Sequence, residues 1–411
     1  MSHHVLFDLS RLLSRAERSV PTGIDRVEMA YAEHALATDP QGLAFVGMLT
    51  WGRFGLLGKP WAVELIETLA RAWRSDPPDT AAVARAAALA RRLRIERLWR
   101  GGLGLGAGVR RAGSRAVYLH LSHQRLERAA LIAALKRRAD ALFVCMVHDL
   151  LPLEFPEYVR PGHAARHVQR MTTVAELADL VIANSGVTRD ALQSFCARVG
   201  RSPPVLVAPL GVDASMRASD IAAPDVPYFV CVGTIEPRKN HLLVLNVWRR
   251  LAIELGPAAP RLVLVGQRGW ENEQVIDMIE RSPAVRGLVD EKNDLSDAAM
   301  ARLLTGAVAA LVPSFGEGYG LPVVEALALG VPVLCSDIAA FREVAGGTAE
   351  FLDPLDGPAW CRAIVDYVQP GSPRRAAQCA RLAAWRRPTW SDHFAAVDAM
   401  IDEIVARSAR V

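Results

Sequence analysis

Short apolar runs alternate with helical stretches along most of this 411-residue chain. The runs are rich in Val, Leu, Ile and Phe and are apolar on both faces, as strands buried in parallel sheets require. Such alternation predicts βα units and parallel sheets of the doubly wound class. The predicted strands are 5–9, 43–49, 116–121, 141–147, 180–184, 204–209, 227–233, 261–266, 309–313, 331–336 and 350–352. The helical stretches between them include 24–36, 164–178, 241–254, 296–305 and 322–329.

A single sheet would have to hold about a dozen strands, which open twisted sheets rarely do. The sequence therefore predicts two Rossmann-like domains, with a boundary near the small, proline-containing segment 213–227. We assign residues 1–215 to the first domain and 216–386 to the second. Ligands of such sheets bind beyond the carboxyl ends of the strands, so two domains facing each other are expected to enclose a cleft there.

Charge, cysteine usage and hydropathy exclude several classes of protein. The formal net charge of +4 does not by itself indicate a nucleic-acid partner, and the basic excess is local, because residues 71–115 hold eleven arginines against three acids. The six cysteines lack metal-binding or redox spacing, which favours reduced core residues. No apolar run is long enough for a membrane span, and no cleavable signal pattern is present. We expect a cytoplasmic protein that binds no nucleic acid.

The most informative stretch is PSFGEGYGLPVVEALALGVPVLCSD, residues 313–337, which runs from a predicted strand through a glycine-rich turn into a helix. Pro322 is favoured in the first turn of a helix. Backbone amides at such a helix N-terminus are typical of phosphate sites. The residues that would supply them are Gly318, Tyr319, Gly320 and Leu321. Glu317 and Glu325 can face the same bound molecule, although that spacing alone is more often found in surface acids.

This segment resembles the signature of glycosyltransferase family 4, whose members are retaining nucleotide-sugar enzymes with the α/β GT-B fold of two Rossmann-like domains. In that family the first acid contacts the transferred sugar and the second holds the nucleotide ribose. The resemblance implies these roles for Glu317 and Glu325. It also implies that the C-terminal helix, within 387–411, crosses back to the first domain.

The loop VGTIEPRKNH, residues 232–241, carries Arg238 and Lys239 directly after a predicted strand. Two cations can bind a diphosphate there, and on the residues alone an exposed basic turn explains the pattern equally well. The string resembles the family's diphosphate-binding loop, which implies that Arg238 and Lys239 neutralise the leaving nucleotide and that Lys239 is catalytic. Many members carry an arginine directly after the glycine, where this chain has Thr234. More of the neutralisation then depends on Arg238 and Lys239.

His148 and Asp149 end the apolar run 141–147. A histidine at a strand end is more often structural than catalytic. However, VHDLLPLEFP, residues 147–156, resembles the family's His-Asp region near the reacting sugar carbon. The resemblance implies that His148 contacts the donor sugar and stabilises oxocarbenium-like charge, and that Asp149 orients His148 or the acceptor.

Weaker matches complete the implied donor site. Thr22 and Asp25 have the spacing of a capping box, and the family's N-terminal glycine loop implies that Gly23 lies near the phosphates. Gly266 and Leu295 resemble residues near the nucleotide base. No metal-binding DxD signature follows a strand, and the family is usually metal-independent. We expect no metal and no cofactor other than the nucleotide-sugar co-substrate.

Residues 61–140 match no part of the family, yet they contain the arginine-rich segment RRLRIERLW at 91–99. Arg91, Arg92 and Arg94 alternate there with apolar residues. One interpretation is an amphipathic helix that lies on an anionic membrane or contacts the acceptor. The other is a solvated helix whose apolar residues join the core. Peripheral contact with the inner face of the cytoplasmic membrane follows only from the first.

The resemblance implies a retaining, metal-independent hexosyltransferase of bacterial surface-polysaccharide synthesis. The strings TIEPRKN and GQRGW resemble mannosyl- and deoxyhexosyltransferases, so GDP-mannose is the favoured donor. A UDP- or dTDP-sugar, for glucosyl or rhamnosyl transfer, remains open. The expected acceptor is a glycan or a polyprenyl-diphosphate-linked sugar. Two other classes also remain, namely a GT-B nucleotide-sugar epimerase and a non-catalytic membrane- or nucleic-acid-binding protein.

Overall fold

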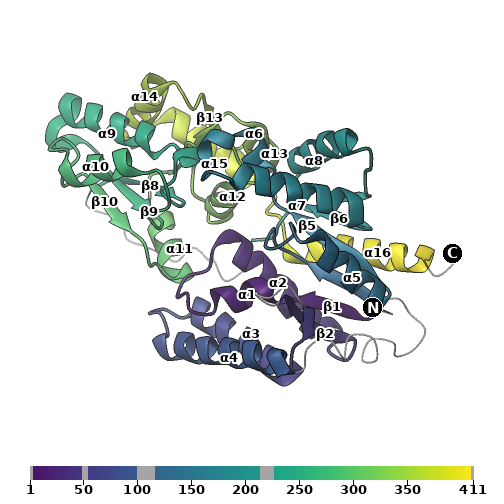
Figure 1. The fold of residues 1–411 in the computed structure, drawn as a ribbon. Coiled ribbons are helices and arrows are strands. Elements are labelled where there is room, and N and C mark those ends of the chain that lie inside the picture. The colour runs from purple at the N-terminus through teal and green to yellow at the C-terminus, as the bar shows by residue number, and fades with distance from the viewer. Residues whose placement is uncertain (1–2, 49–53, 100–115, 213–225, 409–411) are drawn as a thin grey trace. The chain divides into compact units, whose positions relative to one another are not determined.

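The computed structural model describes residues 3–48, 54–99, 116–212 and 226–408, which form two compact units (Figure 1). The first unit contains Met1–Glu154, Pro161–Gly211 and Thr389–Val411, and the second contains Phe155–Arg160 and Val212–Pro388. The boundary expected at residues 215 and 216 lies outside the described residues. The short segment Phe155–Arg160 belongs to the second unit although both of its flanks belong to the first.

Within the described ranges, the first unit holds a seven-stranded sheet with the order β3-β2-β1-β4-β5-β6-β7. Neighbouring strands pair in parallel, except that β3 pairs antiparallel with β2 at the edge. The prediction missed β3, because a three-residue strand with a central glycine carries little signal. The strands are β1 Val5–Asp8, β2 Leu43–Met48, β3 Phe54–Leu56, β4 Ala116–His120, β5 Ala141–Val147, β6 Leu180–Ala183 and β7 Val205–Val207.

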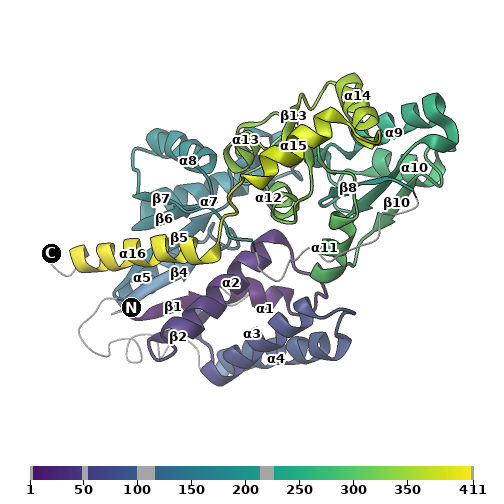
Figure 2. The same cartoon turned by 180° about the vertical axis from the view of Figure 1, so that it is seen from behind.

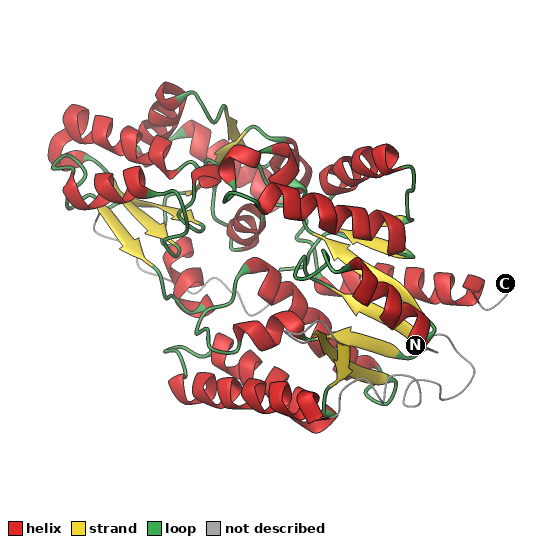
Figure 3. Ribbon diagram, in the orientation of Figure 1, coloured by secondary structure: helices red, strands yellow, loops and turns green. Residues whose placement is uncertain are grey.

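Helices connect and cover this sheet, as Figure 3 shows in red. They are α1 Ser10–Arg15, α2 Gly23–Thr38, α3 Lys59–Arg74, α4 Thr80–Trp99, α5 Ala129–Ala139, α6 Leu151–Glu154, α7 His163–Leu177, α8 Gly186–Val199 and α16 Trp390–Ser408. The described part of the region without family resemblance contains most of α3, all of α4 and β4, and α5, and α3 and α4 pack against each other. Leu65, Leu69 and Trp73 are buried on one side of α3, at the spacing of successive helical turns.

The second unit holds, within its described residues, a six-stranded parallel sheet with the order β10-β9-β8-β11-β12-β13. Its strands are β8 Tyr228–Val232, β9 Arg261–Val265, β10 Val289–Lys292, β11 Ala310–Val312, β12 Val333–Ser336 and β13 Glu350–Leu352. The predicted pair of doubly wound parallel sheets is thus confirmed. The prediction missed β10, because its sequence, Val-Asp-Glu-Lys, is polar and lies at the sheet edge.

The core of the second unit is built around two large aromatic side chains. Trp248 and Trp360 are fully buried, and their indole N–H groups donate to the backbone oxygens of Pro260 and Asp353 at 2.8 and 2.9 Å. The helices of this unit are η1 Pro156–Tyr158, η2 Pro237–Lys239, α9 His241–Leu255, η3 Gly256–Ala258, α10 Glu273–Arg281, α11 Asp297–Thr305, α12 Leu321–Ala328, α13 Ala339–Ala345, α14 Gly357–Val368 and α15 Pro373–Ala383.

The C-terminal helix α16 returns to the first unit (Figure 2). Its His393 Nε2 lies 2.7 Å from the hydroxyl of Tyr31 on α2, and Phe394 packs edge-on against the same tyrosine ring. The other ring nitrogen of His393 donates to the backbone oxygen of Pro209 at 3.0 Å. Gly211 lies so close to this helix that an added Cβ would stand 2.2 Å from the backbone nitrogen of Trp390.

No helix among the described residues is both long enough and apolar enough to cross a membrane.

Because an added Cβ at residue 211 would stand too close to the backbone of Trp390, a methyl group there should weaken the packing of α16. We expect Gly211→Ala to lower the free energy of unfolding by about 1–3 kcal/mol, because the contact is with backbone and cannot be relieved by rotating a side chain. Thermal unfolding of the full chain measures this, with Gly347→Ala as the control, since a Cβ there meets nothing within 4 Å. Equal melting temperatures for the two variants would contradict the close docking of α16.

Candidate functional site

Each sheet has one place where the chain order reverses, between β8 and β11 in the second unit and between β1 and β4 in the first. In parallel sheets the carboxyl ends of all strands lie at the same edge, and ligands bind at that edge beside the reversal point. The two candidate sites are therefore the loops that follow β8 and β11, and those that follow β1, β4 and the neighbouring β5.

The loops after β8 and β11 are joined by hydrogen bonds. The backbone N–H of Phe315 donates to the backbone oxygen of Arg238 at 2.9 Å. In return, Nη1 of Arg238 donates to the backbone oxygen of Gly316 at 2.6 Å. Residues predicted to bind one donor from two distant stretches of sequence thus belong to one connected structure.

Three predicted site residues form an ion cluster in these loops. Lys239 Nζ donates to Oε1 of Glu317 at 2.5 Å, and Arg238 Nη1 lies 2.8 Å from Oε2 of the same carboxylate. The hydroxyl of Ser314 also donates to Oε1, at 2.8 Å. Arg238 uses Nη2 to pair with Glu236 at 2.7 Å. The structure brings Arg238, Lys239 and Glu317 together, but here they bind one another.

The protonation state of Glu317 follows from these partners. Burial alone would raise the pKa of its carboxyl group, but the charges of Arg238 and Lys239 and the hydrogen bonds from Lys239 and Ser314 outweigh burial and lower the pKa to about 2. Burial raises the pKa of Glu236 despite the same two cations. Glu317 is thus the firmly ionised acid of the cluster, and it pairs with both cations.

The glycine-rich loop leads directly into α12, whose first residue is Leu321. Gly320 has φ +105°, and a Cβ there would stand 2.8 Å from the ring of Phe341, so only glycine fits. The positive end of the α12 dipole therefore lies at the loop that holds Glu317. Tyr319 is buried, and Glu325 is half-buried on α12, one turn into the helix. Gly318 lies in the same loop, between Glu317 and Tyr319.

The residues expected near the nucleotide base follow β9 and β10 at the same edge of the sheet. Gly266 directly follows β9, and a Cβ there would stand 2.0 Å from the backbone oxygen of Gly233, so its small size lets two loops approach each other. Leu295 is half-buried and precedes Ser296, whose hydroxyl caps α11 by accepting from the N–H of Ala299 at 3.1 Å.

An aromatic stack ties the segment Phe155–Arg160 to this site. The rings of Tyr158 and Phe315 stack with centroids 5.3 Å apart. The indole N–H of Trp270, in the loop after β9, donates to the backbone oxygen of Tyr158 at 3.1 Å, and the Arg160 guanidinium lies 5.4 Å from the Trp270 ring centroid. Sequence reasoning did not assign any of these aromatic residues.

In the first unit, His148 lies directly after β5 and is 5% exposed. Its Nε2 lies 2.7 Å from the backbone oxygen of Leu121. A carbonyl oxygen only accepts, so Nε2 carries the proton and Nδ1 carries the lone pair. Burial lowers the pKa of His148 to about 4. It is therefore a neutral imidazole at pH 7, suited to accepting a hydrogen bond rather than supplying a cation.

The backbone of His148 is anchored as firmly as its ring. Its N–H donates to Nε2 of His123 at 3.1 Å, and its oxygen accepts from the Asn184 amide at 2.9 Å and the Thr188 hydroxyl at 3.2 Å. The adjacent Asp149 accepts from the N–H of Leu151 at 3.2 Å. These bonds fix the direction in which both predicted residues leave the strand.

A buried network at the ends of β1 and β4 was not predicted. Asp8 accepts from the Tyr118 hydroxyl at 2.6 Å and lies 3.2 Å from His120 Nδ1. Burial opposes ionisation of Asp8, but hydrogen bonding and the charge of His120 lower its pKa. His120 Nε2 is buried without a hydrogen-bond partner. Asp8 and His120 each end an apolar run, so the rule that selected His148 could have found them.

The predicted capping box at the start of α2 is confirmed, since Asp25 accepts from the backbone N–H of Thr22 at 2.8 Å. The same carboxylate accepts a hydrogen bond from Nε of Arg11, on the helix α1 that follows β1, at 2.6 Å. Gly23 is the first residue of α2 and is half-buried. Burial raises the pKa of the neighbouring Glu28 well above its ordinary value.

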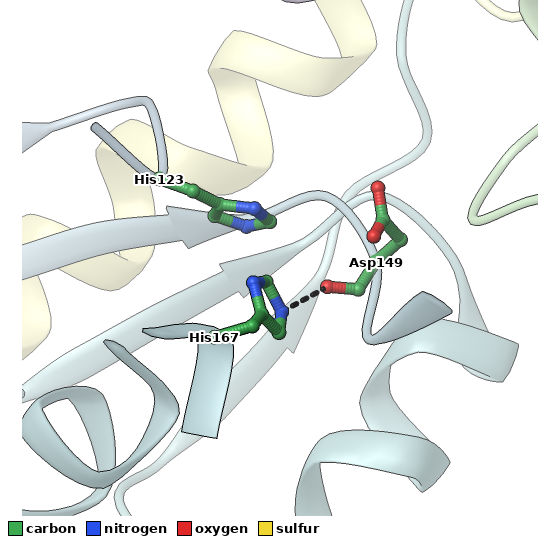
Figure 4. Close-up of side chains that lie close together, drawn as sticks. All are labelled: His123, Asp149 and His167. Carbon is green, nitrogen blue, oxygen red and sulfur yellow. Dashed lines mark hydrogen bonds between the residues drawn. The ribbon is translucent and has the colours of Figure 1, made fainter. Parts of the chain in front are cut away.

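Two histidines and an acid also come together in the first unit (Figure 4). His123, Asp149 and His167 each present one ligand atom, and these atoms lie within 4.8 Å of one another. Burial is the main cause that lowers the pKa of both His123 and His167. Sequence reasoning missed this cluster because it connects a loop, a strand end and the middle of α7, and because no motif marks His123 or His167.

The arginine-rich segment forms the last part of α4. Arg92 lies over the ring of Trp61 at 3.6 Å from its centroid, and Arg94 donates to the backbone oxygen of Leu13 at 2.5 Å. Arg91, Arg92 and Arg94 are all exposed, and the intervening Leu93 is fully buried. Arg92 and Arg94 nevertheless contact other residues of the first unit.

The ion cluster of the second unit lies in a segment that matches a known protein family. Residues 226–369, which contain the ion cluster and the glycine-rich loop, match the family described as Glycosyl transferases group 1. The matched segment lies within the second unit. Glu317, Glu325, Arg238 and Lys239 all lie inside it.

The curated relatives of the chain include two mannosyltransferases of Escherichia coli. The chain is 34% identical over 165 residues to O-antigen chain mannosyltransferase B of Escherichia coli, an alignment that covers 40% of this chain and 43% of the relative. It is 30% identical over 249 residues to the serotype-specific mannosyltransferase WbdA of Escherichia coli, covering 56% of this chain and 30% of the relative. The chain thus spans less than half the length of these relatives.

Solved structures share the fold. The α,α-trehalose 6-phosphate synthase of Burkholderia multivorans superimposes with a TM-score of 0.63 at 14% identity, covering 100% of both chains. The Anabaena protein HepE, solved in complex with UDP-glucose, superimposes with a TM-score of 0.62 at 14% identity, covering 97% of this chain and 99% of that one. The chain has the GT-B fold.

The free energy of unfolding should depend on pH in a way that reflects the lowered pKa of Glu317. Because the folded-state pKa of about 2 lies below the ordinary 4.5, the carboxylate contributes stability that is fully present above about pH 5 and is lost as the pH falls toward 2. The free energy of unfolding of the wild type should therefore approach that of Glu317→Gln in this window only. Urea unfolding at a series of pH values measures both curves, and a gap that stays constant down to about pH 2 would contradict the assignment.

Proposed function

We propose that this chain is a glycosyltransferase that moves a hexose, with mannose favoured, from a nucleotide diphosphate sugar to a glycan or polyprenyl-diphosphate-linked acceptor in bacterial surface-polysaccharide synthesis. The observation that carries the proposal is the cluster of Lys239, Arg238 and Glu317 at the reversal point of the second sheet. Its location inside the segment that matches the family Glycosyl transferases group 1 supports it. Because nucleotide sugars are made in the cytoplasm, we place the reaction there.

The cluster suits a diphosphate because its cations are already positioned. Lys239 and Arg238 are 12% and 17% exposed at the side chain and are held by Glu317, so no reorganisation from solvent is needed when an anion binds. As the bond to the sugar breaks, one further negative charge develops on the leaving diphosphate. The two cations and the N-terminus of α12 stabilise that charge.

Binding of the diphosphate also changes what Glu317 can do. A phosphate oxygen competes for Lys239 and Arg238, and the carboxylate that they release can accept hydrogen bonds from sugar hydroxyls. Glu325, one turn into α12, is the proposed partner of the ribose hydroxyls, and Gly266 and Leu295 are the proposed neighbours of the base. The donor would then extend along one edge of the sheet, past the ends of β10, β9, β8 and β11.

In the first unit, His148 is the proposed contact of the transferred sugar. Its neutral ring keeps Nδ1 as an acceptor, which can bind a sugar hydroxyl beside the reacting carbon. Asp149 is the proposed orienting residue, and Gly23 the proposed neighbour of the phosphates. We propose that transfer retains the anomeric configuration without a divalent metal at the diphosphate, and that the leaving phosphate accepts the acceptor's proton.

Loss of the ion cluster should abolish transfer. We expect Lys239→Ala and Glu317→Gln each to lower kcat by at least about 100-fold, because each removes a group that stabilises the developing charge or positions the sugar. Radiolabelled sugar transfer to a glycan acceptor measures this. Glu343→Gln on α13 serves as the control, since Glu343 is exposed and lies outside the loops of the cluster. Wild-type rates in both cluster variants would overturn the proposed site.

Glu325→Ala should behave differently from the cluster variants. A ribose contact acts before and during reaction alike, so its loss raises KM for the donor with little effect on kcat. We expect about a tenfold weaker binding of the free nucleoside diphosphate, measured by calorimetry. An unchanged binding constant would contradict the ribose role.

The donor can be identified by stabilisation. A ligand that binds only the folded chain at about 100 times its Kd adds about 2.7 kcal/mol, which raises the melting temperature by several degrees. We expect the largest shift with GDP-mannose in a panel that also holds UDP-, dTDP- and ADP-sugars. A larger shift with UDP-glucose or a dTDP-sugar would replace mannose in the proposal, and proton NMR of the product would then establish its anomeric configuration.

A further inference from the structure

We propose that His123, Asp149 and His167 form a binding site for a divalent transition-metal ion of the zinc class. The three residues come from separate elements, namely the loop after β4, the end of β5 and the helix α7 (Figure 4). All three belong to the first unit, apart from the ion cluster of the second. Two imidazoles and a carboxylate are one of the donor sets that hold Zn²⁺ in proteins.

The spacing of the three side chains fits one ion. Bonds from Zn²⁺ to imidazole nitrogen and carboxylate oxygen are about 2.0–2.2 Å long, so donor atoms in a tetrahedral site stand about 3.4 Å apart. The donor atoms here lie within 4.8 Å of one another. Side-chain rotations that move the donor atoms by about an ångström are therefore enough to bring them to metal-binding distance. Three protein ligands leave a fourth coordination position for water or another small ligand.

The tautomer of His167 is set by its surroundings. Its Nε2 lies 3.3 Å from the backbone oxygen of Asp149, and a carbonyl oxygen only accepts. The proton therefore sits on Nε2, and Nδ1 carries the lone pair that a metal requires. A ligating histidine whose second nitrogen donates to a backbone carbonyl is the usual outer arrangement of metal sites.

Metal binding at His123 has a consequence for His148. In the ion-free chain, Nε2 of His123 accepts from the backbone N–H of His148 at 3.1 Å. A neutral imidazole has one lone pair, so coordination through either nitrogen leaves Nε2 unable to accept that hydrogen bond. Metal binding at His123 would therefore remove the hydrogen bond that His123 accepts from the backbone N–H of His148. This part of the inference rests on the proposed function, whereas the metal site itself does not.

Binding of Co²⁺ to the full chain tests the site, because its visible d–d absorption reports coordination without any activity measurement. Tag-free protein carrying Cys379→Ser is the parent, since Cys379 is the exposed cysteine among those that the structure describes. We expect one Co²⁺ per chain, displaced by one equivalent of Zn²⁺.

Variants locate the ion. His123→Gln and Asp149→Asn, made separately in the parent, should each weaken Co²⁺ binding at least about tenfold. Both residues are half-buried, and thermal unfolding without metal verifies that each variant folds. His34→Gln is the matched control, because it removes a half-buried histidine of the same unit that pairs with Asp398 instead. It should bind Co²⁺ as the parent does.

No bound Co²⁺ in the parent, or equal affinity in parent, His123→Gln and Asp149→Asn, would overturn the metal site. Loss of binding in His34→Gln to the same degree as in His123→Gln would overturn it as well. A chain that binds Co²⁺ in the expected pattern but transfers no sugar would contradict the proposed function and support the metal site. An active chain that binds no Co²⁺ would support the proposed function and contradict the metal site.

Discussion

The parallel pairing of β8 with β11 is the constraint on which the candidate donor site depends. The register places Val230 beside Ala310 and Cys231 beside Leu311, so both strands end at the same edge. Only then can Lys239 and Glu317, 78 positions apart, meet at hydrogen-bond distance. A buried carboxylate without these cations would be costly, and buried cations without the carboxylate equally so. The pairing of strands and the neutralisation of charge therefore stabilise each other.

The first unit repeats the architecture with different chemistry. Beyond its strand ends, on the loop after β4, directly after β5 and on α7, lie His123, His148 and His167, whose pKa values burial lowers. Neutral imidazoles and hydroxyls recognise polar, uncharged groups, whereas paired cations recognise anions. The two sheets thus carry different side chains at their ligand-binding edges.

Sequence reasoning predicted the fold well because buried parallel strands are continuous apolar runs. It missed β3 and β10, which are short or polar edge strands whose pairing depends on tertiary neighbours. It selected Arg238 and Lys239 as a pair of diphosphate ligands and Glu317 as a sugar ligand, but a ligand-binding motif does not reveal that its members bind one another. His167 could not have been found at all, because a histidine in mid-helix is meaningful only once its neighbours are known.

The segment Phe155–Arg160 has a consequence for how the chain can be divided. Because it belongs to the second unit while both flanks belong to the first, and because α16 returns to the first, the backbone passes between the units after Glu154, Arg160, Gly211 and Pro388. A fragment that ends at the interdomain linker would lack α16 and leave Tyr158 without Phe315 and Trp270. The complementary fragment would lose the aromatic cover of its glycine-rich loop. Neither fragment would therefore contain every segment of its own unit.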